Sequence, residues 1–196
     1  MREIDLIVLD RDGVLIAMVV DEDHGVLDSA KRLDDVRLLP GVSDFVRQCN
    51  AKSIPIAIAS NQPGVARGQI SPSRVQEIDA RMRSLLGEEE AYLGASFYCF
   101  HHPEGVLREF AVRCKCRKPA PGLLLQAMSF YRARPSSSWM IGDGFTDVQA
   151  GQAAGCSTGL LANPKLDLLS LLASRGIVPD VISTAFAELG KRVFSR

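Results

Sequence analysis

Short runs of aliphatic residues alternate along the chain with longer stretches in which apolar residues recur every three or four positions. The short runs predict strands that are buried on both faces, and the spaced patterns predict helices that cover a sheet with one side. Strands are predicted over residues 6–9, 55–59, 96–100, 138–141, 156–162 and 180–182. Because helical stretches lie between them, the predicted fold class is a mostly parallel, doubly wound α/β sheet.

Capping residues and prolines mark where the helices begin. The predicted starts lie at or near Pro40, Ser71, Pro121, Asp147, Asn163 and Thr184. The apolar faces that would pack on the sheet contain Val42, Phe45, Val46 and Cys49, then Val75, Ile78, Met82 and Leu85, then Leu124, Met128 and Tyr131, then Leu168, Leu169 and Leu172, and finally Phe186, Leu189 and Val193.

Residues 14–39 show no sustained period and include the acidic patch at residues 21–23. A segment of that length within a compact domain usually serves function, holds a small inserted element or is mobile. We expect it to flank a functional site. His24 is a candidate substrate contact there, and the alternative is a histidine that is simply solvated.

The composition fits one globular domain over residues 1–196, because 46% of the residues are apolar and 23% are charged. The formal net charge is zero, which argues against nucleic acid as a partner. The pattern predicts neither a secretory signal nor a membrane span, since no basic start leads into an apolar stretch and no long apolar run occurs. We expect a cytoplasmic monomer that binds a small molecule.

The most informative stretch is residues 6–13, an aliphatic strand followed by Asp10, Asp12 and Gly13. Acids at the carboxyl end of a buried strand lie where open α/β sheets bind ligands. Two carboxylates this close need a cation between them, and Mg²⁺ prefers carboxylate, water and phosphate oxygens. The alternative is that both acids only form a turn, for which Asp and Gly are common residues.

Polar side chains also occur at three further strand ends or helix entrances. They are Ser60 and Asn61, Arg117 and Lys118, and Asp143 and Asp147. Each has a local explanation, as a turn or as a solvated basic pair. In a doubly wound sheet, however, these ends meet at one crevice. An acid pair, a second acid, hydroxyl and amide donors and one lysine fit phosphoryl transfer through an aspartyl-phosphate.

Three of the five cysteines cluster with histidine between residues 99 and 116. Cys99, His101, Cys114 and Cys116 would provide three thiolates and one imidazole, which is a closed set for a tetrahedral structural Zn²⁺. A metal is favoured over disulfides in a reducing cytosol. His102 is the rival of His101, which we prefer because the Cys-x-His step mirrors the Cys-x-Cys step. Coincidental core cysteines are the alternative.

The order of these motifs resembles the haloacid dehalogenase (HAD) superfamily of phosphatases. More narrowly, Asp-Arg-Asp-Gly, Ser-Asn-Gln-Pro-Gly-Val-Ala-Arg-Gly, Cys-Phe-His-His-Pro and Cys-Lys-Cys-Arg-Lys-Pro are similar to the group of D-glycero-D-manno-heptose-1,7-bisphosphate 7-phosphatases and histidinol phosphatases. The match spans about residues 4–160, and the zinc loop joined to Cys-Arg-Lys-Pro is its most specific part. The resemblance implies a HAD-like fold without a cap domain.

The resemblance also implies roles for the acids. Asp10 would be the nucleophile, and Asp12 would protonate the leaving oxygen and then activate water. Mg²⁺ would bind Asp10, the backbone carbonyl of Asp12 and Asp143. Asp147 would be an indirect partner of the metal or a residue at a helix N-terminus.

Ser60 and Lys118 would hold the transferring phosphoryl group. The candidate substrate contacts are Asn61, Gln62, Arg67 and Arg117, of which Arg117 is best placed to reach a second phosphate. The implied substrate is a heptose 1,7-bisphosphate, and histidinol phosphate or another small phosphate ester is the alternative. A catalytically silent, zinc-stapled scaffold is a third possibility, but it would have no physical reason to keep the acids and the lysine together.

Some positions depart from the family pattern. Gly144 stands where this family often has a lysine, so one cation near the metal site is missing. Pro63 replaces a usual serine, and residues 14–16 lack an asparagine that is common there. These differences leave the hydrolytic residues intact and bear on the choice of substrate.

Overall fold

The computed structural model describes residues 3–21, 26–161 and 176–195. Its main sheet has six parallel strands in the order β5-β4-β1-β6-β7-β8. In this order the strands are Ser96–Cys99, Ile56–Asn61, Leu6–Leu9, Ser138–Gly142, Ser157–Leu161 and Val181–Ser183. The predicted parallel, doubly wound α/β fold is confirmed.

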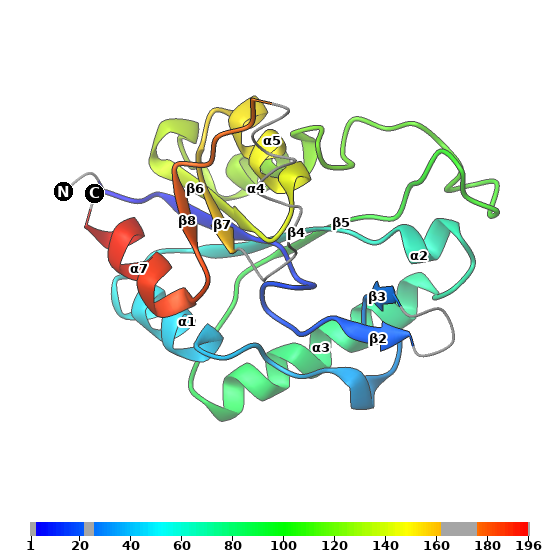
Figure 1. Cartoon of the computed structure of the whole chain (residues 1–196), viewed down its shortest axis with the longest axis horizontal. Coiled ribbons are helices and arrows are strands. Elements are labelled where there is room, and N and C mark those ends of the chain that lie inside the picture. Colours follow the sequence, from blue (N-terminus) through cyan, green and yellow to red (C-terminus); the bar gives the residue numbers. More distant parts are fainter. Residues whose placement is uncertain (1–2, 22–25, 162–175, 196) are drawn as a thin grey trace.

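Helices cover both faces of this sheet (Figure 1). One face carries α1 (Val42–Ala51), α3 (Pro72–Glu88) and α7 (Phe186–Phe194), and the other carries α4 (Gly122–Tyr131) and α5 (Phe145–Ala154). Shorter helices lie in loops: α2 (Pro63–Ala66), η1 (Leu33–Asp35) and η2 (Pro135–Ser137). Within the described ranges, no helix combines the length and the apolar character needed to cross a membrane.

The aliphatic run of β1 contains no polar position because this strand contributes side chains to two cores. In β1, Ile7 and Leu9 belong to a large core shared with α1, α3 and α7. Leu6 and Val8 belong to a second core beneath α4 and α5. All four side chains are fully buried, as expected for a strand whose alternate residues point to opposite, covered faces.

The order of the strands reverses at β1, with β4 and β5 on one side and β6 to β8 on the other. Such a reversal opens a crevice at the carboxyl ends of the strands. The antiparallel hairpin β2 (Val19–Asp21) and β3 (Val26–Asp28), helix α2 and the loop of residues 100–121 project at this end (Figure 1). The long loop is attached to α2, because the N–H groups of Val106 and Leu107 both donate to the carbonyl of Ala66.

One detail of the predicted helices is wrong and another is incomplete. Leu85 packs partly buried against the core, as predicted for the apolar stripe of α3, and the fully buried Leu86 extends that stripe. The terminal helix starts at Phe186 with no side-chain cap, so the predicted cap Thr184 is wrong, and the Ser183 hydroxyl accepts the N–H of Ala185 just before the helix. Exact helix ends are the part of a helix that periodicity resolves least well.

The segment of residues 14–39, which has no sustained period, contains the β2–β3 hairpin and η1. A small inserted element is therefore present, as one of the three explanations for its length predicts. His24 lies outside the described residues, and so does the helix predicted to start at Asn163.

Ser71→Ala should destabilise the protein, because the Ser71 hydroxyl accepts the N–H of Arg74 at 3.1 Å and caps α3. We expect the free energy of unfolding, measured by urea denaturation, to fall by about 1 kcal/mol. Ser84→Ala is the matched control, at an exposed position inside the same helix, where alanine should leave stability equal or slightly higher. Equal losses in both variants would contradict the capping role.

Candidate active site

Strand β1 delivers Asp10 and Asp12 to the crevice, and the chain then turns at Gly13, whose φ is +79°. A Cβ atom on Gly13 would lie 2.4 Å from Oδ2 of Asp143. Glycine is needed here for two reasons, because the turn requires a positive φ and because a carboxylate approaches the backbone. The glycine therefore allows Asp143, which directly follows β6, to lie against the loop that follows β1.

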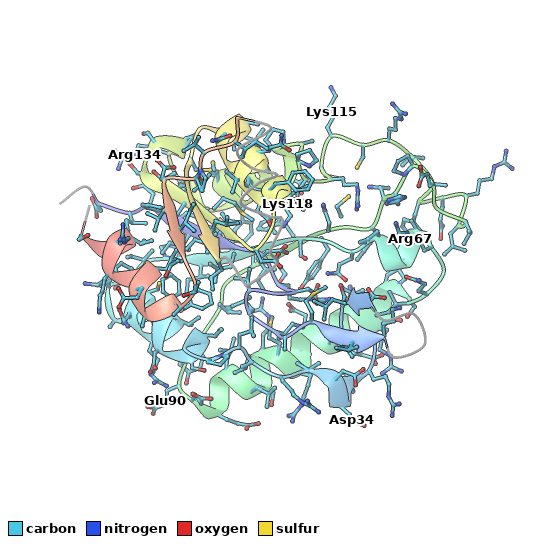
Figure 2. The ribbon with its side chains drawn as sticks, viewed as in Figure 1. Asp34, Arg67, Glu90, Lys115, Lys118 and Arg134 are labelled. Carbon is cyan, nitrogen blue, oxygen red and sulfur yellow. The ribbon has the colours of Figure 1, made fainter. Side chains whose placement is uncertain are left out.

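Lys118 is the cation at the centre of the site. Its side chain is 1% exposed, and its Nζ lies 3.0 Å from Oδ2 of Asp10 and 2.5 Å from Oδ1 of Asp147. Nζ also donates to the carbonyl oxygen of Ala59, 2.7 Å away. Figure 2 shows that Lys115, in the same loop, extends away from the molecule while Lys118 lies within it. The basic residue nearest the acids is thus a buried ammonium rather than a solvated one.

Burial and charge pairing have opposite effects on the pKa of Lys118 and on that of Asp147. Desolvation favours the neutral form of Lys118, but Asp10 and Asp147 outweigh it and raise the pKa of the lysine. For Asp147, burial is the stronger effect and raises the pKa of the carboxyl group to about 6, despite the adjacent ammonium. The lysine therefore stays charged, and Asp147 shares the ammonium with the more exposed Asp10.

Asp10, Asp143 and Asp147 each offer a carboxylate oxygen, and these atoms lie within 4.8 Å of one another. Asp147 stands in the first turn of α5, where it accepts the N–H of Gly144 at 3.0 Å. Hard oxygen donors at one sheet edge fit Mg²⁺, which takes one or two carboxylates and completes its shell with water and phosphate oxygens. The carboxylate of Asp12 is not in this group, so only its backbone carbonyl stays a predicted ligand.

Asn61 holds the loop that carries Lys118. Its Nδ2 donates to the carbonyl oxygen of Lys118 at 2.9 Å, and its Oδ1 accepts the N–H of Lys118 at 3.0 Å. Both polar groups of the amide are engaged by one backbone unit. This side chain therefore fixes the position of the lysine, and its contact with substrate stays a prediction.

Gln62 was also predicted to contact substrate, but it is 3% exposed and bonded to protein on both sides of its amide. Its Nε2 donates to Oδ2 of Asp12 at 2.7 Å and to Oγ of Ser60 at 3.2 Å. Its Oε1 accepts from Nη2 of Arg11 at 2.9 Å. Both hydrogens of the amide are thus engaged by Asp12 and Ser60, and a contact of Gln62 with substrate stays a prediction. Ser60 is buried in the same network.

Arg11 is the residue of this site that the sequence pattern did not reveal. Its side chain is fully buried and pairs with Asp12 at 3.0 Å. The available signal was a cation placed between two acids in the chain. Arginine is rarely buried unless it is paired, however, and the pattern does not say that Asp12 would be its partner.

The four predicted zinc ligands come together in the loop between β5 and α4. The Sγ atoms of Cys99, Cys114 and Cys116 lie 3.2 to 3.6 Å apart, and Nδ1 of His101 lies 3.5 Å and 3.6 Å from two of them. Thiolates around a tetrahedral Zn²⁺ would be separated by about 3.8 Å. Three sulfur donors and one imidazole at these separations fit Zn²⁺ after a small expansion.

His102 does not share that cluster. Its Nδ1 accepts the N–H of Glu104 at 3.1 Å, and its Nε2 lies 3.3 Å from Nη2 of Arg67. Partial burial lowers the pKa of His102, and the cations Arg117 and Arg67 lower it further. The two arginines that were predicted to contact substrate lie close enough to affect each other's charge, and the N–H of Arg117 donates to Sγ of Cys114 in the cysteine cluster. Figure 2 shows Arg67 at the same end of the molecule as Lys115.

Known proteins resemble this chain over most of its length. Residues 115–188 match the HAD-hydrolase-like family. The D-glycero-beta-D-manno-heptose-1,7-bisphosphate 7-phosphatase of Escherichia coli (strain K12) is 32% identical over 160 residues, which cover 82% of this chain and 80% of the relative. The enzyme of the same name from Yersinia pestis is 30% identical over 195 residues, which cover 100% of this chain and 98% of the relative.

Solved structures also resemble this chain. The crystal structure of D,D-heptose 1,7-bisphosphate phosphatase from B. bronchiseptica, complexed with magnesium and phosphate, matches with a TM-score of 0.78 and 27% identity over 97% of this chain and 98% of that chain. The enzyme of the same name from Burkholderia thailandensis, at 18% identity and a TM-score of 0.66 over 97% of this chain and 99% of that chain, shares the fold. The chain therefore belongs to the family of HAD-like phosphatases that contains the heptose-1,7-bisphosphate 7-phosphatases.

Proposed function

We propose that this protein is a Mg²⁺-dependent phosphatase that hydrolyses the 7-phosphate of D-glycero-D-manno-heptose 1,7-bisphosphate through an aspartyl-phosphate. The observation that carries the proposal is the buried ammonium of Lys118 between Asp10 and Asp147, with Asp143 close by. Such a site can receive a phosphoryl group and a divalent cation together. The choice of substrate comes from the relatives, whose names state this activity.

Asp10 is the nucleophile in this proposal. Its Oδ1 accepts the N–H of Arg11 at 2.7 Å, and its Oδ2 lies 3.0 Å from Nζ of Lys118, so the carboxylate is fixed before substrate binds. An oxygen of Asp10 bonds to phosphorus while the bond from phosphorus to the sugar oxygen breaks. Asp12 gives its proton to that leaving oxygen, and Lys118 balances the charge of the phosphoryl group.

Hydrolysis of the aspartyl-phosphate restores the enzyme. Asp12, now a carboxylate, takes a proton from water as the water oxygen bonds to phosphorus and the bond to Asp10 breaks. Mg²⁺, held by Asp10, Asp143 and the backbone carbonyl of Asp12, would offset the repulsion between the nucleophile and an anionic substrate. Asp147 keeps Lys118 in place and would support the metal indirectly.

Zn²⁺ has a structural role in this proposal, because three thiolates and one imidazole leave no coordination position open for substrate. The loop that it would close runs from Cys99 to Cys116, and Lys118 follows two residues later. Asn61 binds the backbone of the same lysine from β4. The metal and the amide would together fix the position of the ammonium.

Arg67 and Arg117 are proposed to bind the second phosphate of the substrate. Burial lowers the pKa of Arg117, and the nearby Arg67 lowers it further, so an anion between the two guanidinium groups would be favourable. Ser60 is proposed to contact the phosphoryl group that is transferred. Gly144 follows Asp143 where the family often has a lysine, so this position contributes no cation beside the proposed metal ligands.

We further propose that the protein acts in the cytoplasm, as a monomer, on a small substrate rather than on nucleic acid or a membrane surface. Free thiols that could bind a metal are typical of a reducing compartment. A net charge of zero gives no general attraction to polyanions.

Turnover of several phosphate esters tests the substrate. With Mg²⁺ present, kcat/KM for a heptose 1,7-bisphosphate should exceed that for histidinol phosphate by about 10²-fold or more, because only the bisphosphate can engage Arg117 and Arg67 while its other phosphate reacts. The same assay with both anomers shows which configuration at C1 is preferred. Equal values for histidinol phosphate would indicate a broader phosphatase, and no phosphate release from any ester would favour the silent scaffold.

Asp10→Asn should abolish turnover, because an amide cannot form the aspartyl-phosphate. We expect the rate of Mg²⁺-dependent phosphate release to fall by about 10³-fold or more. Asp34→Asn makes the same change at an exposed acid of η1 and should keep wild-type activity. Substantial activity in a folded Asp10→Asn protein would contradict the assignment of Asp10 as the nucleophile.

His101→Ala tests the zinc ligands. Elemental analysis of the wild type should give about one zinc per chain. His101→Ala should lower the zinc content and, because the loop precedes Lys118, reduce activity as well. His102→Ala removes the neighbouring imidazole and should keep the zinc. A zinc-free wild type, or equal zinc in the two variants, would argue against this assignment.

A further inference from the structure

The side chain of Arg11 lies in the site but has no role in the mechanism above. Its side chain is fully buried, and its guanidinium group makes a two-pronged contact with Asp12. Nε lies 3.2 Å from Oδ2, and Nη2 lies 3.0 Å from Oδ2 and 3.2 Å from Oδ1. Burying a guanidinium group is costly even when it is paired, so a fully buried arginine beside a reacting carboxyl group calls for a functional explanation.

Gln62 also donates a hydrogen bond to Oδ2 of Asp12, the oxygen that Arg11 contacts most closely. Its Nε2 donates to Oδ2 of Asp12 at 2.7 Å, and its Oε1 accepts from Nη2 of Arg11 at 2.9 Å. The three side chains therefore form a closed ring of contacts. Oδ2 of Asp12 accepts from three donor atoms, whereas Oδ1 accepts from one, at 3.2 Å. Since each carboxylate oxygen has two lone pairs, Oδ1 is the oxygen that retains capacity for a proton.

The position of Arg11 is itself fixed by residues from two other elements. Its Cζ lies 5.6 Å from the ring centroid of Tyr98, on β5, in a cation–π contact. The Tyr98 hydroxyl donates to Oδ1 of Asp79 at 2.5 Å, and Nε of Arg83 donates to Oδ2 of the same carboxylate at 2.7 Å. Asp79 and Arg83 belong to α3. The arginine is thus held by the fold and not only by its acidic partner.

We propose that Arg11 and Gln62 are positioning residues that orient Asp12 for proton transfer, with the transferred proton on Oδ1. The inference rests on the proposed function, in which Asp12 protonates the leaving oxygen. Donors on Oδ2 prevent the carboxyl group from rotating, so Oδ1 is presented in one direction. Such orientation matters because a displacement of about 1 Å in a reacting group can cost about 10²-fold in rate.

Substrates with different leaving groups distinguish a role in proton transfer from a purely structural role. A sugar phosphate needs a proton on its leaving oxygen, whereas 4-nitrophenyl phosphate releases a stable phenolate without one. The value of kcat/KM covers only the steps up to the aspartyl-phosphate, and so isolates this proton transfer. Asp12→Ala should lower kcat/KM for the sugar phosphate by about 10²- to 10⁴-fold, and that for the aryl ester far less.

Gln62→Met keeps the length of the side chain but removes the amide that holds Asp12. We expect kcat/KM to fall by about 10- to 10²-fold for the sugar phosphate and by less than about threefold for 4-nitrophenyl phosphate. In the Asp12→Ala background, the same substitution should cause no further loss, because the residue that it positions is gone. A structural residue would lower both activities in either background.

Asn61→Leu is the matched control, because its amide lies next to Gln62 in the chain but holds Lys118 instead of Asp12. Both esters need the lysine, so this variant should lose activity on both to the same extent. Arg11→Lys keeps the charge without the two-pronged geometry and should reproduce the leaving-group selectivity of Gln62→Met. If Arg11→Lys does not fold, as judged by thermal unfolding, Gln62→Met carries the test.

Equal losses on the two esters in folded Gln62→Met, or a further loss in the Asp12→Ala background, would overturn the inference while leaving the phosphatase activity established. A wild-type protein that hydrolyses neither ester would instead overturn the proposed function, and this inference with it. The two failures are therefore distinguished by the wild-type assay.

Discussion

The buried ammonium of Lys118 is the interaction on which the rest of the site depends. A cation removed from water needs counter-charges at contact distance, and Asp10 and Asp147 provide them at 3.0 Å and 2.5 Å. Conversely, carboxylates this close would repel one another without a cation between them. The lysine therefore allows the acids to be assembled before a metal and a phosphate bind.

Segments far apart in the sequence determine where that ammonium lies. Asn61, at the end of β4, binds the backbone of Lys118, and the cysteine cluster lies in the loop that leads to it. Gly13 and Gly142 lack side chains where the acids approach, and a Cβ atom on Gly142 would lie 2.2 Å from that of Asp147. Opposite charges are thus held in a small volume by the end of β4, by the loop that precedes Lys118 and by the two glycines.

Much of the fold follows from local patterns. Runs of consecutive aliphatic residues can be buried only between two covering layers, so the strands and the parallel class were predictable, and the helices followed from their apolar spacing. The same patterns were weaker in detail, because they omitted Leu86 from the buried stripe of α3 and predicted a cap at Thr184 that α7 lacks. They gave no sign of the β2–β3 hairpin, because short strands leave little periodicity.

For the site, the sequence by itself determined which acids, thiols and cations follow the strands, since those positions are read along the chain. Only the tertiary structure decided what each polar side chain binds. It placed the amides of Asn61 and Gln62 against Lys118 and Asp12, which the sequence did not predict, and it buried Arg11 against Tyr98. The physical reason is that a hydrogen-bonding group has several partners within reach, and packing between distant segments selects among them.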